Sequence, residues 1–200
     1  MTKRILIGSP IQQQPEILQE FLTSLAELDQ KNLMIEYQFI DDNISDDSKD
    51  LLREFANDRE MVVIDKYEGE KGTYHCDEYT HYWKEEQIWK VAEMKDQIIA
   101  YAIQNNFDYL FLVDSDLVLH PCTLIQLIKT EKDIVSNIFW TKWQPTASEL
   151  PQVWLQDEYT LYTKRRNETL TEEEIGQRTH AFLEKLQQPG TYEIGGLGAC

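Results

Sequence analysis

The stretch YLFLVDSD, from Tyr109 to Asp116, decides the fold. Its first five residues form an unbroken apolar and aromatic run, which is typical of a strand that is buried on both faces of a parallel sheet. The run ends directly at Asp114-Ser115-Asp116. Open α/β sheets bind their ligands at the carboxyl ends of their strands, so the stretch predicts a central strand with a ligand site at its end.

Apolar segments alternate with amphipathic segments on both sides of this strand. We expect further strands at 5–7, 35–40, 61–64, 134–138 and 192–194. We expect helices with buried faces at 17–28, 51–55, 91–102, 124–128 and 175–186, the last opened by a capping box of Thr171 and Glu174. This alternation predicts the α/β class, with a mainly parallel sheet that is flanked by helices on both faces.

The length of 200 residues and the hydrophobic content of 42% suit one domain, which we expect over 1–200. Residues 66–87 combine charges, tyrosines and glycines, which favours a surface loop or lid. The segment 140–190, which begins with a tryptophan-rich stretch from Trp140 to Trp154, is expected to be an insertion and acceptor-side region. No closing helix follows the glycine-rich end at Cys200, so we expect the domain to be truncated at its C-terminus.

The net charge of −17 excludes nucleic acid as the main partner, because it repels phosphate backbones and anionic lipid surfaces at long range. The three cysteines lie far apart and form no disulfide framework. No apolar run reaches the length of a transmembrane segment. These features predict a cytoplasmic protein, with peripheral contact as the alternative for any membrane association.

An Asp-x-Asp triplet is common by chance. The evidence that Asp114 and Asp116 form a ligand site is therefore their position at the end of a strand. Two carboxylates two residues apart at such an edge suit one hard cation, Mn²⁺ or Mg²⁺, whose remaining ligands are diphosphate oxygens. A diphosphate neutralised in this way leaves more easily. The alternative is a solvated turn after the strand.

A second carboxylate pair, Asp41-Asp42, follows the strand of 35–40, and the strand ends of a parallel sheet share one edge. A carboxylate there can accept hydrogen bonds from a base N–H or a ribose hydroxyl. The pair also suits a turn that caps the next helix, and the two roles are compatible. Ser9, Pro10 and Ile11 close the first strand on the same edge and offer backbone groups to a nucleotide.

Three stretches, 5–10, 39–46 and 111–116, occur in the order found in the family 2 glycosyltransferases. The chain resembles that family over residues 4–140, and the two aspartate motifs are the most specific part of the resemblance. The resemblance implies the GT-A fold, the Rossmann-like fold of nucleotide-diphospho-sugar transferases. It also implies an inverting, metal-dependent transferase of the hexosyltransferase type that uses a UDP- or GDP-linked sugar.

The same resemblance assigns roles to individual residues. Asp41 or Asp42 contacts the base, and Asp114-Ser115-Asp116 serves the diphosphate and its cation. Lys95 lies in the helix that often supplies a basic contact to the diphosphate. Gly195-Gly196 is similar to the glycine-bearing strand that borders the acceptor, and the acceptor itself is left open between a glycan, a lipid and a protein.

Inverting members of that family place a carboxylate base after the glycine-bearing strand, and here the chain ends at Cys200. We therefore assign no base and expect the chain to bind the donor better than it transfers sugar. If transfer is efficient, Asp157 and Glu158 become the candidate bases.

Three further groups carry weaker signals. One lacks the spacing of a zinc site and fits a polar loop over the donor: His75, Cys76, Asp77 and His81. Another suits a sugar platform or core packing equally well: Trp140, Trp143 and Trp154. The dense basic run Lys164-Arg165-Arg166 suits a solvated patch or a phosphate contact.

Two other functions compete with sugar transfer. A phosphatase of the haloacid dehalogenase type also places two aspartates after an apolar strand, but its motif opens the domain, whereas three expected strands precede Asp114. A non-catalytic nucleotide-binding domain keeps the site and lacks the base. Hydrolysis of a nucleoside-diphosphate sugar separates the transferase from both alternatives.

Overall fold

The computed structural model describes residues 2–69, 84–142, 146–157 and 160–198, together with the backbone of 75–76 and 81–82. The chain forms two compact units, Met1–Gln126 and Leu127–Ala199. None of the described helices combines the length and the apolar content that a membrane span requires. The expectation of a single domain over 1–200 stays a prediction.

The first unit is built on a four-stranded parallel sheet with the strand order β3-β2-β1-β6. Its strands are β1 (Lys3–Ile11), β2 (Leu33–Asp41), β3 (Val62–Lys66) and β6 (Tyr109–Leu112). Each of the four strands that the sequence predicts here is present. The sequence predicts the strand at 109–113 to be central and buried on both faces, but β6 lies at the edge of the described sheet and its residues are half-buried. The predicted α/β class with a parallel sheet is confirmed, and the arrangement is Rossmann-like and consistent with a GT-A-like fold.

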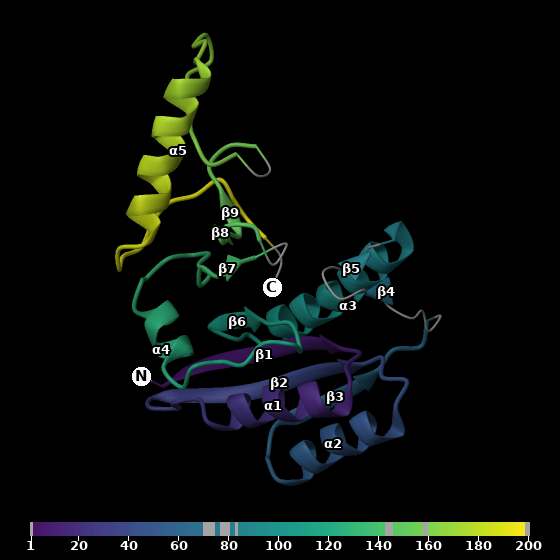
Figure 1. The fold of residues 1–200 in the computed structure, drawn as a ribbon. Coiled ribbons are helices and arrows are strands. Elements are labelled where there is room, and N and C mark those ends of the chain that lie inside the picture. The colour runs from purple at the N-terminus through teal and green to yellow at the C-terminus, as the bar shows by residue number, and fades with distance from the viewer. Residues whose placement is uncertain are drawn as a thin grey trace. The chain divides into compact units, whose positions relative to one another are not determined.

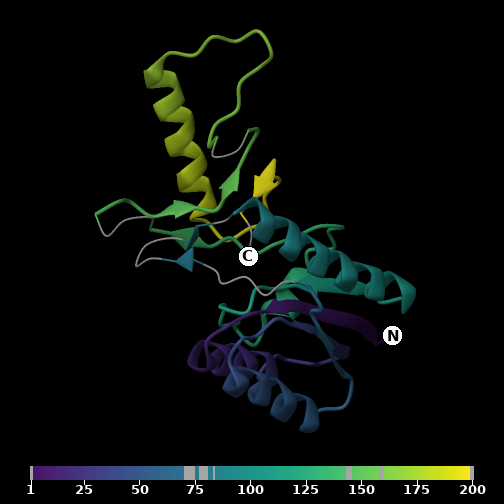
Figure 2. The ribbon, with the colours of Figure 1, turned by 90° about the vertical axis from the view of Figure 1, so that its right-hand side faces the viewer.

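Helices cover both faces of this sheet (Figures 1 and 2). The helices α1 (Pro15–Ala26) and α2 (Asp46–Asn57) lie on one face, and α3 (Glu85–Gln104) lies on the other. On the α1 and α2 face, the Tyr37 hydroxyl donates to the Leu25 carbonyl oxygen at 3.3 Å, and the Tyr37 ring lies edge-on to Phe55 at 5.3 Å. These contacts tie the central strand β2 to both helices.

On the α3 face, one apolar cluster joins the helix to the sheet. Its buried members are Leu6, Ile40, Met94, Ile98 and Ala102. Gly8 allows the close approach, because a Cβ atom at this position would lie 2.2 Å from Ile98 Cγ2. The packing fixes the register of α3 along β1.

Two helices begin five or more residues earlier than the sequence predicts. The helix α2 starts at Asp46, because Asp46 and Asp47 are favourable in the first turn of a helix. The helix α3 starts at Glu85, inside the predicted loop of 66–87. Within the same loop, β4 (His75–Cys76) and β5 (His81–Tyr82) form an antiparallel pair, and its residues 70–74, 77–80 and 83 lie outside the described residues.

The second unit packs one helix, α5 (Glu172–Leu186), on short strands. The antiparallel pairs are β7 (Trp140–Thr141) with β8 (Leu150–Pro151), and β9 (Val153–Trp154) with β10 (Gly196–Leu197). The buried residues of its core are Val153, Phe182 and Leu186. The capping box is confirmed, because Glu174 N donates to Thr171 Oγ1 at 3.3 Å and Thr171 N donates to Glu174 Oε2 at 2.8 Å.

Two predicted strands are wrong. Residues 134–138 are irregular, and Ile134 is 88% exposed, because none of the described strands pairs with this segment to bury its apolar side chains. The last strand is Gly196–Leu197 in place of 192–194, since Tyr192 and Ile194 pack against the α5 cluster. The short helix expected at 124–128 is present as α4 (Thr123–Ile128).

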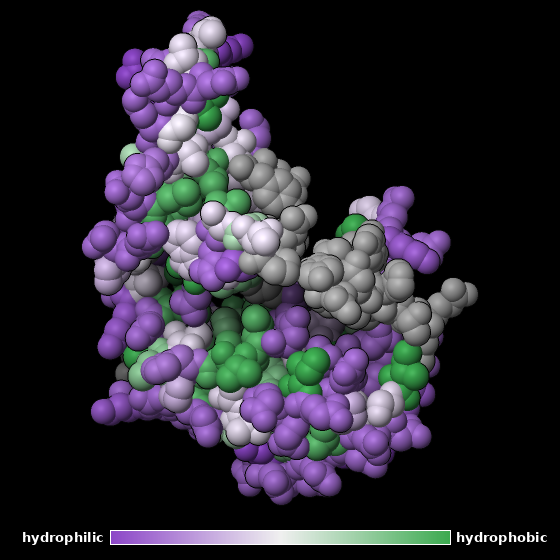
Figure 3. Space-filling model, in the orientation of Figure 1, coloured by the Kyte–Doolittle hydropathy of each residue, from purple (hydrophilic) through white to green (hydrophobic). Residues whose placement is uncertain are grey.

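Hydrophilic side chains cover much of the surface of two helices. On the face drawn in Figure 3, hydrophilic residues predominate over α2 and α5.

Candidate donor-binding site

The strand order places a topological switch point between β1 and β6. The strands β2 and β3 follow β1 on one side of the sheet. The connection that contains α3 then leads to β6, which pairs with β1 on its other side. β1 pairs with β2 as far as Ile11 but with β6 only as far as Gly8. Open α/β sheets bind ligands in the crevice outside the carboxyl ends at such a point.

Asp114-Ser115-Asp116 lies at this switch point, as predicted from the apolar run before it. Val113 N donates to the Gly8 carbonyl oxygen at 3.1 Å, which extends the β1–β6 ladder to the residue before Asp114. Ser115 is buried at 7% exposure, whereas Asp116 is exposed and the Asp114 side chain is 37% exposed. Both carboxylates of the triplet are therefore accessible to solvent, and the serine between them is buried.

Lys95 of α3 pairs with Asp114. Its Nζ lies 3.1 Å from Asp114 Oδ1, and its side chain is 24% exposed. The sequence names both residues as contacts of a diphosphate site, and the structure brings them together. An ammonium group thus already occupies a cation position on Asp114.

A second lysine of α3, Lys90, was missed by the sequence analysis. Its Nζ lies 2.5 Å from Asp42 Oδ2, with the two side chains 9% and 0% exposed. The ammonium also lies 4.8 Å from the centre of the Tyr67 ring. The available signal was the spacing of Lys90 four residues before Met94, which places a lysine on the buried stripe of the helix.

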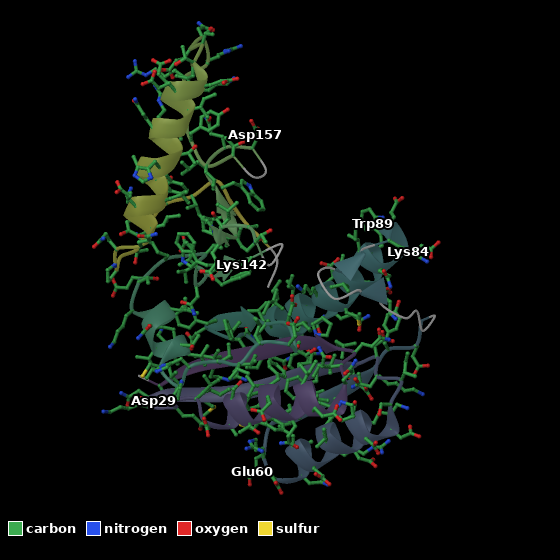
Figure 4. All side chains as sticks on the ribbon, in the orientation of Figure 1. Asp29, Glu60, Lys84, Trp89, Lys142 and Asp157 are labelled. Atoms are coloured by element: carbon green, nitrogen blue, oxygen red, sulfur yellow. The ribbon has the colours of Figure 1, made fainter. Side chains whose placement is uncertain are left out.

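The helix α3 therefore forms ion pairs with residues that follow two different strands of the sheet. Lys90 reaches Asp42, the first residue after β2, and Lys95 reaches Asp114, the second residue after β6, on the two sides of β1. Lys90 and Lys95 are five residues apart, and on a helix this spacing separates their directions by about 140° around the axis. The two side chains can therefore reach different strand ends from neighbouring turns of α3. Figure 4 shows Lys84 and Trp89 at the same end of α3, and both are exposed.

The adjacent aspartates Asp41 and Asp42 have different environments. Asp41 is half-buried, and its Oδ1 accepts from Asn43 N at 2.9 Å and from Asn43 Nδ2 at 2.8 Å. Asp42 is buried against Lys90. The turn-forming role that the sequence allows for this pair therefore belongs to Asp41, and of the two only Asp41 has a side chain in contact with solvent.

Tyr67 closes this corner of the site. Its hydroxyl donates to Glu93 Oε2 at 3.3 Å, and its backbone N–H donates to the Asp41 carbonyl oxygen at 3.1 Å. Desolvation, followed by the nearby Glu93 carboxylate, raises the pKa of the Tyr67 phenol. The hydroxyl is thus held in its neutral, donating form.

The end of β1 presents little side chain to the crevice. Ser9 and Ile11 are fully buried, and the Ser9 hydroxyl donates to the Pro10 carbonyl oxygen at 3.3 Å. Pro10 is half-buried. Any contact of these residues with a nucleotide therefore involves the backbone, which the sequence predicts, or the Pro10 ring.

Gly195 and Gly196 lie in the second unit. A Cβ at Gly195 would be 2.3 Å from the Leu155 carbonyl oxygen, and one at Gly196 would be 2.1 Å from Trp154 Nε1. Close packing against Trp154 and Leu155 is therefore enough to explain both glycines, whether or not they also border an acceptor. Asp157 is exposed in the same unit, and Glu158 lies outside the described residues.

The weaker signals divide between packing and polar surface. Trp140 packs against the α5 core, and Trp143 lies outside the described residues, as do the side chains of the zinc-type group at 75–81. Lys164 and Arg165 line a polar hollow of about 460 Å³ with Glu168 and Arg178. Among the described residues, no group of three or more His, Cys, Asp or Glu side chains is arranged to hold a metal.

A parallel sheet of this order, with carboxylates and a lysine at its switch point, is typical of α/β proteins that bind nucleotides. Residues 2–178 match the model of the glycosyltransferase family 25 N-terminal domain, and the chain belongs to this family. No curated protein gives a significant match. The predicted glycosyltransferase class is confirmed, while the match does not support family 2 in particular.

Proposed function

We propose that this glycosyltransferase domain takes its sugar from a nucleoside-diphosphate donor bound outside the carboxyl ends of β1 and β6. The observation that carries the proposal is the ion pair of Lys95 and Asp114 at the switch point. It places a cationic and an anionic group, both in contact with solvent, at the position where α/β sheets bind phosphorylated ligands.

The donor set at this point fits a divalent cation. Asp114 already holds one cationic group at 3.1 Å, and Asp116 is exposed two residues further on. Two carboxylates with solvent access leave coordination positions for diphosphate oxygens, which suits Mg²⁺ or Mn²⁺. When bound, such a cation supplies charge neutralisation to the departing nucleoside diphosphate.

The residues of the chain divide the remaining work. Lys95 donates hydrogen bonds to diphosphate oxygens, and Asp114-Ser115-Asp116 serves the diphosphate and its cation. Asp41 accepts from the base or the ribose, while Asp42 and Lys90 fix the end of β2 from within. Gly195 and Gly196 border the acceptor, and an inverting transfer of a hexosyl group is the reaction we propose.

The test is the turnover of UDP- and GDP-linked hexoses, measured as release of free sugar and nucleoside diphosphate with Mn²⁺ or Mg²⁺ present. We expect donor hydrolysis that stops with a chelator and that is lost in Asp114→Asn. Hydrolysis of phosphomonoesters in place of the donor would favour the phosphatase alternative. Binding without any turnover of the donor would favour a non-catalytic domain.

A further inference from the structure

The two ion pairs of α3 differ in how open they are to solvent. Lys90 and Asp42 are 9% and 0% exposed, so that pair is closed. Lys95 and Asp114 are 24% and 37% exposed at 3.1 Å. Partly exposed pairs contribute little net free energy, so the second pair can open at small cost while the first holds the helix in place.

The partly exposed ion pair of Lys95 and Asp114 disfavours the binding of either ligand by itself. A divalent cation that approaches Asp114 meets the Lys95 ammonium, which has the same sign of charge and occupies the same carboxylate. A nucleoside diphosphate that approaches Lys95 meets Asp114 and the exposed Asp116, which repel it. Each ligand would therefore leave one member of the pair without a counter-charge in a partly dehydrated site.

Both ligands together remove this conflict. The cation can take Asp114 while the diphosphate takes Lys95, so each protein charge exchanges one opposite partner for another. The charge of the cation then offsets most of the charge of the diphosphate. Neither ligand alone reaches that balance.

We propose that Lys95 couples the two binding events: it neutralises Asp114 in the empty site and transfers to the diphosphate when the cation arrives. This inference rests on the proposed function and adds that Lys95 strengthens the cooperative binding of cation and nucleoside diphosphate, beyond the direct contact between the two ligands. By thermodynamic reciprocity, each ligand raises the affinity for the other by the same factor. Lys90 keeps α3 in register during the exchange.

The test is a calorimetric cycle with four titrations: Mn²⁺ alone, UDP alone, Mn²⁺ with saturating UDP, and UDP with saturating Mn²⁺. GDP replaces UDP in a parallel set. The cycle is run on the parent chain, on Lys95→Met, which keeps the length of the side chain without its charge, and on Lys84→Met. Lys84 is exposed at the start of the same helix and serves as the matched control.

In Lys95→Met we expect Mn²⁺ alone to bind about fivefold more tightly, the size of one partly exposed ion pair. We expect the coupling factor between Mn²⁺ and UDP to fall by about tenfold, within the range of such couplings. Lys84→Met should behave as the parent does. Thermal unfolding of each variant confirms that α3 is intact.

An unchanged coupling factor in Lys95→Met would overturn the inference, and so would weaker binding of Mn²⁺ alone. Those outcomes leave the proposed function standing as long as the parent binds UDP or GDP in the presence of Mn²⁺. Failure of the parent to bind either nucleotide with Mn²⁺ would remove the proposed function and this inference together.

Discussion

Lys90 and Asp42 form a buried ion pair that joins the second turn of α3 to the end of β2, with 2.5 Å between Nζ and Oδ2. Removal of one partner from such a pair leaves an uncompensated buried charge, which costs about 3 to 5 kcal/mol. We expect Lys90→Met to lower the free energy of unfolding by that amount in denaturant titrations. The double variant Lys90→Met/Asp42→Leu should recover much of the loss, because an apolar pair needs no counter-charge.

The matched control for this prediction is Lys49→Met. Lys49 also pairs with an aspartate, at 2.7 Å, but Asp46 is 89% exposed. We expect a loss of less than about 1 kcal/mol there. Equal losses in Lys90→Met and Lys49→Met would show that burial of the Lys90 pair carries no energetic weight.

Asp41→Asn separates the two roles of Asp41. Asparagine keeps an oxygen in the position that accepts from Asn43, so the turn and the stability should be preserved. The charge is lost, and we expect nucleoside diphosphate binding to weaken by about 1 to 3 kcal/mol even with a chelator present. Calorimetry with UDP and GDP measures this, with the exposed Asp47→Asn as control; unchanged binding of both would leave Asp41 as a turn former only.

Gly8→Ala should damage the contact between β1 and α3. The added Cβ would lie 2.2 Å from Ile98 Cγ2, so either the helix or the strand must shift, at a cost of about 1 to 3 kcal/mol. Gly176→Ala is the opposite case, because nothing lies within 4 Å of its Cβ position in α5, and we expect a gain of about 0.5 to 1 kcal/mol. Denaturant unfolding of both variants tests the pair, and a harmless Gly8→Ala would contradict the close packing.

The stability of the second unit should depend on pH through Glu168. Arg178 donates from Nη2 to Glu168 Oε1 at 2.6 Å, and this contact, with the Arg165 backbone N–H, lowers the pKa of Glu168 to about 2. Since the folded pKa lies below the ordinary value of 4.5, the stabilisation is complete above that value. It is lost as the pH falls from about 4.5 to about 2.

Carbon-13 NMR titration of the Glu168 carboxyl measures this directly. We expect its inflection to move up toward the ordinary value in Arg178→Met. The difference in unfolding free energy between parent and variant should shrink as the pH falls through the same window. A difference that is constant from pH 6 to pH 2 would show that the ion pair does not form in solution.

The sheet and the main site could be predicted from local patterns. The apolar run 109–113 predicts a strand, and β6 is present there, although its residues Tyr109–Leu112 are half-buried at the edge of the described sheet. The abrupt end of the run at Asp114 marks the carboxyl end of the strand, where parallel α/β sheets bind their ligands. Lys95 was named from a family resemblance, and the structure adds its partner. These features depend on neighbours in sequence or on a rule that holds for every parallel sheet.

The remaining features depend on partners far apart in sequence. Lys90 is buried because Asp42 lies beneath it, 48 positions earlier, whereas a helix lysine is otherwise expected in solvent. Residues 134–138 have strand-like composition, but none of the described strands pairs with them. Gly195 and Gly196 are required by the backbone of Leu155 and the ring of Trp154, which no local pattern reveals.

The central claim is that a divalent cation and a nucleoside diphosphate meet at the β1–β6 switch point, and paramagnetic NMR tests it most directly. Mn²⁺ is added in small amounts to the chain saturated with UDP or GDP, and the broadening of backbone amide signals is recorded. We predict that Ile11, Lys95 and Asp114 broaden first, that Asn32 and Asn105 at the opposite edge of the sheet do not, and that Asp114→Asn abolishes the effect. Broadening centred elsewhere, or unchanged in Asp114→Asn, would contradict the account.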